Sequence, residues 1–286
     1  MPTSTMKAAT TSPLFRISLA EWSLHRALES GGLDHMEFPG VARNDFGIEA
    51  IELVNTFFKT KARDSRYLAE FKQRAGDLGV KTLLIMCDHE GNIGDAIPEE
   101  RNKAVENHLK WLEAAKFLGC HSIRVNAYST GTPEEQSGQV SEGLRKLCEA
   151  AAGMNLNVLL ENHGGLSSNA AWLASVIRKV GMPNCGTLPD FGNWKLEDGS
   201  LYDRYLGLTE LMALAKAVSA KSKEFDTAGN EVESDYRRMV QTVLAAKYHG
   251  YLGIEYGGER MSEPEGIRAT KKLLEKVRDE LSQSCD

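Results

Sequence analysis

Three acidic residues occupy equivalent places in this sequence, each where a short apolar run meets a glycine-containing loop. Glu161 lies in NVLLENHGG, Asp190 in CGTLPDFGN and Glu255 in GYLGIEYGG. A buried carboxylate is costly to remove from water unless a positive charge lies close to it. If the three runs are successive parallel strands, their carboxyl ends share one edge of the sheet, and the acids meet there. The pattern therefore predicts a divalent-metal site or an acid/base site.

Eight short apolar runs recur along the chain, and each is followed by a longer stretch that resembles a helix. The runs begin at Leu14, Gly47, Val80, His121, Leu156, Cys185, Ala217 and Gly250. Strand-like runs that alternate with helix-like stretches are typical of right-handed βα units, which build parallel sheets. Eight such units in 286 residues predict an α/β protein with a single closed (β/α)8 TIM barrel.

A doubly wound open sheet has the same alternation and is the main alternative fold. Such a sheet usually carries a glycine-rich phosphate loop after its first strand. Here the first run leads into AEWSLHRALE, which contains no glycine. The sequence therefore favours the barrel.

The helix-like stretches carry their own start and stop signals. Thr132 and Glu135 have the spacing of a capping box, in which each side chain bonds the other residue's backbone N–H. Gly119 and Gly250 follow helix-like runs, where a left-handed residue often ends a helix. No linker or change of composition interrupts the chain after Leu14. We therefore expect one domain over residues 14–286, preceded by a disordered Ser/Thr-rich leader at residues 1–13.

The bulk composition excludes several classes of protein. The chain is 42% hydrophobic and 26% charged, and its net charge of -6 argues against a broad surface for nucleic acid. No run approaches the roughly 20 apolar residues that span a bilayer, so no membrane partner is expected. The five cysteines form no CxxC pair, which favours free thiols in a reducing compartment. A cytoplasmic location is the expectation.

Other polar residues fall near the same predicted edge of the sheet and describe a pocket. Trp22 and Trp194 are candidate aromatic walls, and Tyr128 adds a hydroxyl. Each of these groups alone is more typical of a solvated rim, but the mixture suits a polyhydroxylated ligand, whose hydroxyls need hydrogen bonds and whose C–H faces pack on rings. The candidate substrate-binding residues are Trp22, Glu52, His89, Asn126, His163, Asn193 and Lys221.

Structural explanations exist for two of the three acids. Glu161 could cap the helix that follows it, and Asp190 could bond to the backbone of its own Phe-Gly turn. Glu255 stands between Ile254 and Tyr256 and needs a partner in that apolar setting. The occurrence of all three acids together favours a functional site.

On these residues the chain resembles the xylose-isomerase-like TIM barrel superfamily, the sugar phosphate isomerase/epimerase group. The resemblance rests on LLENHGG, LPDFGN, AVSAKSKEFD and GIEYGG, and it extends over nearly all of residues 14–281. It implies that Glu161, Asp190 and Glu255 are ligands of a divalent metal (Mn, Mg, Co or Zn). It also implies that Glu161 and Glu255 exchange protons with opposite faces of a sugar. The expected partner is a small-molecule carbohydrate, and barrels of this group often form homo-oligomers.

The sequence departs from the family pattern at two places. The family's strand-seven motif usually reads His-x-Lys-Asp, whereas this chain has Ser219 in place of the histidine that ligates the metal. The epimerase branch commonly has a substrate-binding histidine where Asn193 stands. Three interpretations follow. A metal binds through the three acids with His163 or water, Lys221 neutralises the carboxylates without a metal, or the barrel binds sugar with little catalysis. The first is preferred, since carboxylates suit hard cations.

The leading functional prediction is a sugar isomerase or epimerase that abstracts a proton next to a carbonyl, with Glu161 and Glu255 as catalytic residues. A lyase or dehydratase that acts on a keto-sugar or 3-keto-glycoside uses the same first step and is the runner-up. Metal-dependent phosphodiester cleavage is a second class, because apurinic endonucleases share this barrel, but they assemble a richer metal cluster. A non-catalytic sugar-binding barrel is the third class.

Overall fold

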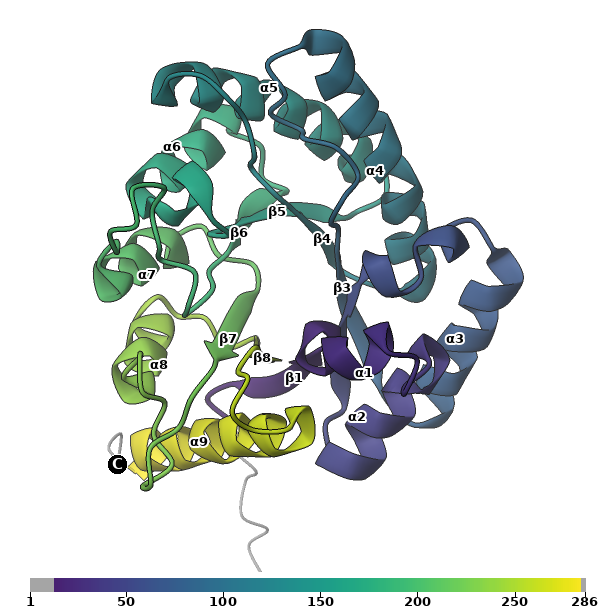
Figure 1. The fold of residues 1–286 in the computed structure, drawn as a ribbon. Coiled ribbons are helices and arrows are strands. Elements are labelled where there is room, and N and C mark those ends of the chain that lie inside the picture. Colours follow the sequence, from purple (N-terminus) through teal and green to yellow (C-terminus); the bar gives the residue numbers. More distant parts are fainter. Residues whose placement is uncertain (1–12, 284–286) are drawn as a thin grey trace, which may run out of the picture.

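All eight predicted strands form, and they run parallel to one another in the computed structural model, which describes residues 13–283. The strands are β1 (Arg16–Ala20), β2 (Ala50–Val54), β3 (Lys81–Met86), β4 (Ser122–Val125), β5 (Asn157–Glu161), β6 (Cys185–Leu188), β7 (Val218–Ser222) and β8 (Tyr251–Tyr256). Each is followed by at least one helix, and the helices surround the strands (Figure 1). The protein is a (β/α)8 TIM barrel, as the alternation of runs predicts.

The barrel closes between β6 and β7 by a looser contact than elsewhere. The other strands are paired continuously in the order β6-β5-β4-β3-β2-β1-β8-β7. Between β6 and β7 there are isolated bridges, of which one joins Asp190 to Ser219. Ser219 donates its backbone N–H to Pro189 O at 2.9 Å and accepts one from Phe191 at 3.1 Å. The closing contact therefore places Asp190 directly beside Ser219.

The helices form an outer ring around the barrel (Figure 1). In the described residues they are α1 (His25–Glu29), α2 (Phe38–Phe46), α3 (Ser65–Asp77), α4 (Pro98–Leu118), α5 (Pro133–Ala152), α6 (Ala170–Val180), α7 (Arg204–Met212), α8 (Tyr236–Ala245) and α9 (Glu263–Gln283). The main hydrophobic core lies between this ring and the outward faces of the strands. A smaller apolar cluster consists of Ala20, Val54, Leu84, Met86, Leu159, Leu188 and Ala217. It lies inside the barrel because side chains alternate between the two faces of each strand.

The helix boundaries confirm most of the predicted signals. Thr132 and Glu135 form the capping box at the start of α5. Gly119 ends α4 with φ 83°, in the left-handed region. The prediction for Gly250 is wrong, since α8 ends at Ala245 and the left-handed conformation falls on Lys247, with φ 60°. Gly250 instead lies against the Tyr248 ring, where a Cβ would come within 2.6 Å of ring carbon Cζ.

Several sequence predictions concern the chain termini and the cysteines. The predicted leader lies outside the described residues, apart from Pro13. Cys87, Cys120, Cys148 and Cys185 are free and buried, as expected, whereas Cys285 lies beyond the described range. Within residues 13–283 no helix is long and apolar enough to cross a membrane.

Candidate active site

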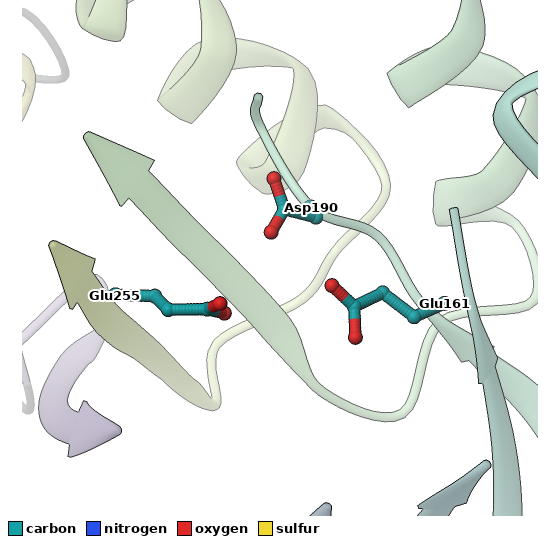
Figure 2. A group of neighbouring side chains, drawn as sticks. All are labelled: Glu161, Asp190 and Glu255. Atoms are coloured by element: carbon teal, nitrogen blue, oxygen red, sulfur yellow. The ribbon is translucent and has the colours of Figure 1, made fainter. Parts of the chain in front are cut away.

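The three acidic residues meet at the carboxyl end of the barrel. Glu161 ends β5, Asp190 follows β6 and Glu255 lies near the end of β8, and their carboxylates point toward one another (Figure 2). One carboxylate oxygen from each lies within 4.8 Å of the others. All three are buried, with Glu161 and Asp190 fully so. The three acids therefore lie together at this edge of the sheet, as the spacing of the strands predicts.

Asp190 is held in place by its own turn and by a side chain that the sequence analysis does not single out. Its Oδ1 accepts backbone N–H groups from Gly192 and Asn193, which is the Asx-type contact foreseen as a structural explanation. Asn162 donates from Nδ2 to Asp190 O at 3.0 Å and accepts the Asp190 N–H at 2.8 Å. Only Oδ2 remains to face the other acids. Asp190 therefore has both a structural role and a place in the cluster.

Two residues of β7 complete the cluster. Ser219 donates a hydrogen bond from Oγ to Glu255 Oε2 at 2.7 Å, and its Oγ also lies 3.2 Å from Asp190 Oδ2. Lys221 stands two positions later and so projects from the same face of the strand. Its Nζ lies 2.7 Å from Glu255 Oε1 and 3.7 Å from Asp190 Oδ2. The cluster thus contains an ammonium group in direct contact with two of its three carboxylates.

The donor set does not fit the four-ligand metal centre that the resemblance implies. The three carboxylates by themselves would suit a hard divalent cation. Ser219, however, supplies a hydroxyl where the pattern calls for an imidazole. A metal ion on Glu255 Oε1 and Asp190 Oδ2 would also compete with Lys221 for these oxygens and face its positive charge at close range. His163 does not complete the set, because within the described residues neither of its ring nitrogens joins the group of ligand atoms that lie within 4.8 Å of one another.

Arg124 is a central residue of the site that the sequence analysis missed. It lies on β4, only 4% of its side chain is exposed, and its Nη1 donates to Asp88 Oδ1 at 2.7 Å. Its Nε lies 2.8 Å from Glu161 Oε2, an ion pair in which neither atom forms a hydrogen bond within the described chain. The sequence does contain a signal for this residue. Arg124 is charged although it lies inside an apolar run, and it stands two positions before Asn126, so both side chains project from the same face of the strand.

The carboxylates differ in their affinity for protons. Burial raises the pKa of Glu161 and that of Asp190 above their ordinary values, although Arg124 and Lys221 respectively act against the increase. Burial acts on Glu255 in the same direction, but the charge and hydrogen bond of Lys221 outweigh it and lower its pKa. Burial likewise disfavours the charged form of Lys221, yet Glu255 and the other acids raise its pKa above the usual range. Lys221 is therefore an ammonium ion at neutral pH.

A cleft of about 440 Å³ opens above the cluster and contains five of the residues predicted around it. Trp22, His89, Asn126, Tyr128 and His163 line this cleft, and so do Arg124 and Glu255. The Trp22 ring stacks on His25 with centroids 4.6 Å apart. Asn126 donates to Asp88 Oδ1 at 2.7 Å. The wall therefore combines one half-buried tryptophan ring with several polar groups.

Four other predicted residues do not line the cleft, although two of them contact the acidic cluster. Asn193 contacts the cluster itself, because its Nδ2 donates to Glu161 Oε1 at 3.1 Å. Lys221 also belongs to the cluster, as described above. Glu52 lies inside the barrel among buried residues and does not line the cleft. Trp194 is not an aromatic wall, since it is only 1% exposed and its ring packs against Gly207 of α7.

Glu52 is a buried carboxyl with one unpartnered oxygen. Ser18 donates to its Oε1 at 2.7 Å, while Oε2 has no hydrogen-bond partner in the described residues. Gly253 makes room for this carboxyl, because a Cβ there would come within 2.5 Å of Oε1. Burial raises the pKa of Glu52 from 4.5 to about 7. The folded protein therefore retains this proton over a pH range in which the unfolded chain loses it.

Replacement of Glu52 by glutamine is expected to change the pH dependence of stability. Between pH 4.5 and about 7 the unfolded wild type binds fewer protons at this site than the folded protein, so its free energy of unfolding falls as pH rises. At about 1.4 kcal/mol per pH unit, the total loss is about 3 kcal/mol. Glu52→Gln should match the wild type at pH 4.5 and exceed it by up to this amount at pH 8. Urea unfolding at both pH values measures the difference.

The exposed Glu49, which precedes β2, provides the matched control for this experiment. Glu49 pairs with Arg43 at the surface, so Glu49→Gln should lower stability by less than about 1 kcal/mol and by a similar amount at both pH values. An equal effect of Glu52→Gln at pH 4.5 and pH 8 would contradict the prediction, because a group that stays ionised in both states contributes no such slope.

Comparison with known proteins agrees with the fold. A family model described as a xylose isomerase-like TIM barrel matches residues 42–277. No curated protein matches the sequence closely enough to be counted as a relative. Many solved structures share the fold of this chain.

The first is 3-keto-D-glucoside 4-epimerase from E. coli, with 18% identity and a TM-score of 0.65, where the match covers 92% of this chain and 99% of that one. The second is a probable 3-DHS dehydratase from Bacillus anthracis, with 17% identity, a TM-score of 0.67 and coverage of 91% and 98%. The third is a protein of this barrel type from Mycobacterium smegmatis in complex with magnesium, with 16% identity, a TM-score of 0.70 and coverage of 96% and 99%. These structural similarities concern the fold, and the match to the family model shows the family. The chain belongs to the xylose isomerase-like TIM barrel family.

Proposed function

We propose that this protein is an enzyme that removes a proton from the carbon next to a carbonyl of a free or oxidised sugar. The observation that carries the proposal is the convergence of Glu161 and Glu255, from β5 and β8, beside a polar cleft that Glu255 and Trp22 line. Two carboxylates that approach a substrate from different strands can take a proton from one face and return one to another. The class of reaction is isomerisation or epimerisation.

Each part of the site has a role in this reaction. The carboxylate of one glutamate takes the proton, the C–H electron pair forms a C=C bond, and the carbonyl oxygen becomes an enolate oxyanion. The other glutamate returns a proton to carbon. Positive groups already lie at this point, since Arg124 contacts Glu161 and Lys221 contacts Glu255. Donors fixed beside the developing oxyanion lower the barrier because they need no reorganisation during the reaction.

The cleft wall provides for recognition of the rest of the sugar. Asn126, His163 and Tyr128 offer donors and acceptors for hydroxyl groups, and Trp22 offers a ring for a C–H face. His89 stands exposed at the cleft with φ 60°. We propose that these residues bind substrate and that Asn193 positions Glu161 through its hydrogen bond.

Elimination from a keto-sugar or 3-keto-glycoside is the alternative outcome of the same first step. One observation favours it. Asn193 stands where the epimerase branch commonly has a substrate-binding histidine. Its neutral amide can form hydrogen bonds, but unlike an imidazole it cannot take up or release a proton. A lyase would remove the same proton and then expel a group from the adjacent carbon.

Deuterium incorporation from D2O tests the proposal. A panel of ketoses, keto-sugars and 3-keto-glycosides is incubated with the protein, and NMR and mass spectrometry follow the carbon next to the carbonyl. Exchange with recovery of a sugar isomer supports isomerisation or epimerisation, while exchange with loss of a substituent supports the lyase. Binding of a sugar without exchange at any carbon would overturn the enzymatic proposal and leave a sugar-binding barrel.

A further inference from the structure

We propose that the ammonium group of Lys221, and not a divalent metal ion, supplies the positive charge at the centre of the acidic cluster. This inference deepens the proposed function, on which its catalytic part rests. It departs from the metal ligation that the resemblance implies and from the interpretation preferred on sequence alone. Four observations support it, and each concerns a different part of the site.

The first observation is the identity of the residue in the fourth ligand position. Ser219 Oγ lies 2.7 Å from Glu255 Oε2 and 3.2 Å from Asp190 Oδ2, so its single O–H donates to a carboxylate, at the shorter distance to Glu255. A metal would require the opposite, an electron pair directed at the ion. The hydroxyl therefore already satisfies oxygens that would otherwise turn toward a metal.

The second observation is the position of Lys221. The register of the barrel places it opposite Glu255 on the neighbouring strand. From there Nζ reaches Glu255 Oε1 at 2.7 Å and lies 3.7 Å from Asp190 Oδ2. An ammonium group has three donors, so the contacts with Glu255 and Asp190 leave a donor available for a ligand oxygen.

The third observation is the space provided for the lysine stem. Gly192, in the loop after β6, lies so close that a Cβ there would stand 3.2 Å from both Cγ and Cδ of Lys221. On another side, a Cβ at Gly257 would stand 3.8 Å from Cε. The stem thus passes between two loops that carry glycine at the points of approach. This packing confines Nζ to the cluster, and only 11% of the side chain is exposed.

The fourth observation is that the third carboxylate has a cation of its own. Arg124 Nε lies 2.8 Å from Glu161 Oε2, and both side chains are buried. Each acid of the cluster therefore contacts a basic side chain of the chain itself. Two cations of the chain, Arg124 and Lys221, thus already offset much of the negative charge of the three acids in this low-dielectric setting.

The chemical consequence is catalysis by hydrogen bonding. When a base carboxylate removes the proton, the carbonyl oxygen gains the negative charge, and Lys221 donates an N–H to it. The proton count is unchanged, because the ammonium group keeps its protons, the ionised glutamate keeps the proton that it takes from carbon, and the other glutamate, protonated at the start, gives a proton to carbon. Loss of one such donor usually lowers the rate by about 10²- to 10³-fold.

Metal binding is the measurement that decides the inference. The full-length protein is dialysed against chelator, analysed by elemental mass spectrometry, and titrated calorimetrically with Mn²⁺, Mg²⁺ and Zn²⁺. We expect far less than one ion per chain and no saturable heat for the wild type. The double variant Ser219→His/Lys221→Met restores the imidazole and removes the ammonium, and we expect it to bind one Mn²⁺ per chain. Tight binding of one ion by the wild type would overturn the inference.

Activity provides the second readout. Exchange by the wild type should survive chelator, Lys221→Met should lower it about 100-fold, and Lys221→Arg should restore part of the loss. Lys216→Met, just before the same strand, is the matched control and should leave the rate unchanged. Loss of wild-type exchange in chelator with recovery in Mn²⁺ would overturn the inference. If no sugar undergoes exchange, the proposed function fails, but calorimetry still decides the identity of the cation. If Lys221→Met does not fold, the wild-type titration still decides it.

Discussion

Glu255→Gln and Glu161→Gln are each expected to lower the rate of deuterium incorporation by about 10²- to 10⁴-fold, the usual contribution of a positioned acid or base. Glutamine keeps the shape of the side chain and can still accept a hydrogen bond from Lys221 or Asn193, but it cannot carry the proton. Circular dichroism and thermal melting should confirm that both variants are folded. NMR in D2O, with any sugar that the wild type exchanges, gives the rates.

The double variant and a surface control make this result specific. Because the two glutamates act on one reaction, Glu161→Gln/Glu255→Gln should be little slower than the more damaged single variant. Glu259→Gln, an exposed change in the loop after β8, should retain the wild-type rate. If either buried variant kept more than about a tenth of the rate, that glutamate would be excluded as the acid or base, since a true one contributes at least about 10²-fold.

Arg124→Met is expected to lower the free energy of unfolding at pH 7 by about 3–5 kcal/mol, which is the usual cost of removing one partner from a buried ion pair. The guanidinium contacts both Asp88 and Glu161, so its loss leaves one half-buried and one fully buried carboxylate without their cation. Methionine fills a similar volume, and the cost is therefore electrostatic more than steric. Urea unfolding gives the value.

The pH dependence distinguishes this explanation from poor packing. Burial alone would raise the pKa of Asp88, but Arg124 lowers it from 3.8 to about 2. A lowered carboxyl pKa gives stability that is present above pH 3.8 and is lost as pH falls toward 2. The difference between Arg124→Met and the wild type should therefore narrow below pH 4. A difference that is constant with pH would show a packing effect instead.

Two further variants complete the test. In Arg124→Met/Glu161→Gln one of the unpaired charges is gone, so part of the lost stability should return. Arg178→Met, at an exposed position of α6, should change stability by less than about 0.5 kcal/mol. If Arg178→Met lost as much stability as Arg124→Met, the prediction that the buried ion pairs of Arg124 cause the loss would be contradicted.

The strands of this fold could be predicted because the physical signal is local. Each apolar run of the barrel wall reads as a strand without knowledge of its neighbours, since both faces of a barrel strand are buried. The residues at which the strands end were less predictable. β4, for example, stops at Val125, whereas the strand-like run that begins at His121, HSIRVNAY, continues to Tyr128. The polar side chains after Val125 leave the ladder and face the cleft, a change of direction that residue type alone does not reveal.

Whether an aromatic or polar residue near the rim lines the cleft depends on how the helices and strands pack. Trp22 and Trp194 both follow strand ends and look equivalent in sequence. Trp22 lines the cleft, but the Trp194 ring lies against α7, where Gly207 leaves room for it. Glu52 likewise has a suitable residue type, yet it lies inside the barrel beside Ser18. These outcomes follow from contacts between elements far apart in the chain.

The sequence by itself determined the barrel, the three strand-end acids and the absence of an imidazole at Ser219, because each is a matter of residue type and of spacing along the chain. Only the tertiary structure decided which cations face those acids. Lys221 reaches Glu255 because β7 and β8 pair in a register that sets these two residues side by side. Arg124 reaches Glu161 because β4 and β5 are neighbours in the closed sheet. Electrostatic partners are fixed by distances between neighbouring strands, and those distances are set only when the strands pair.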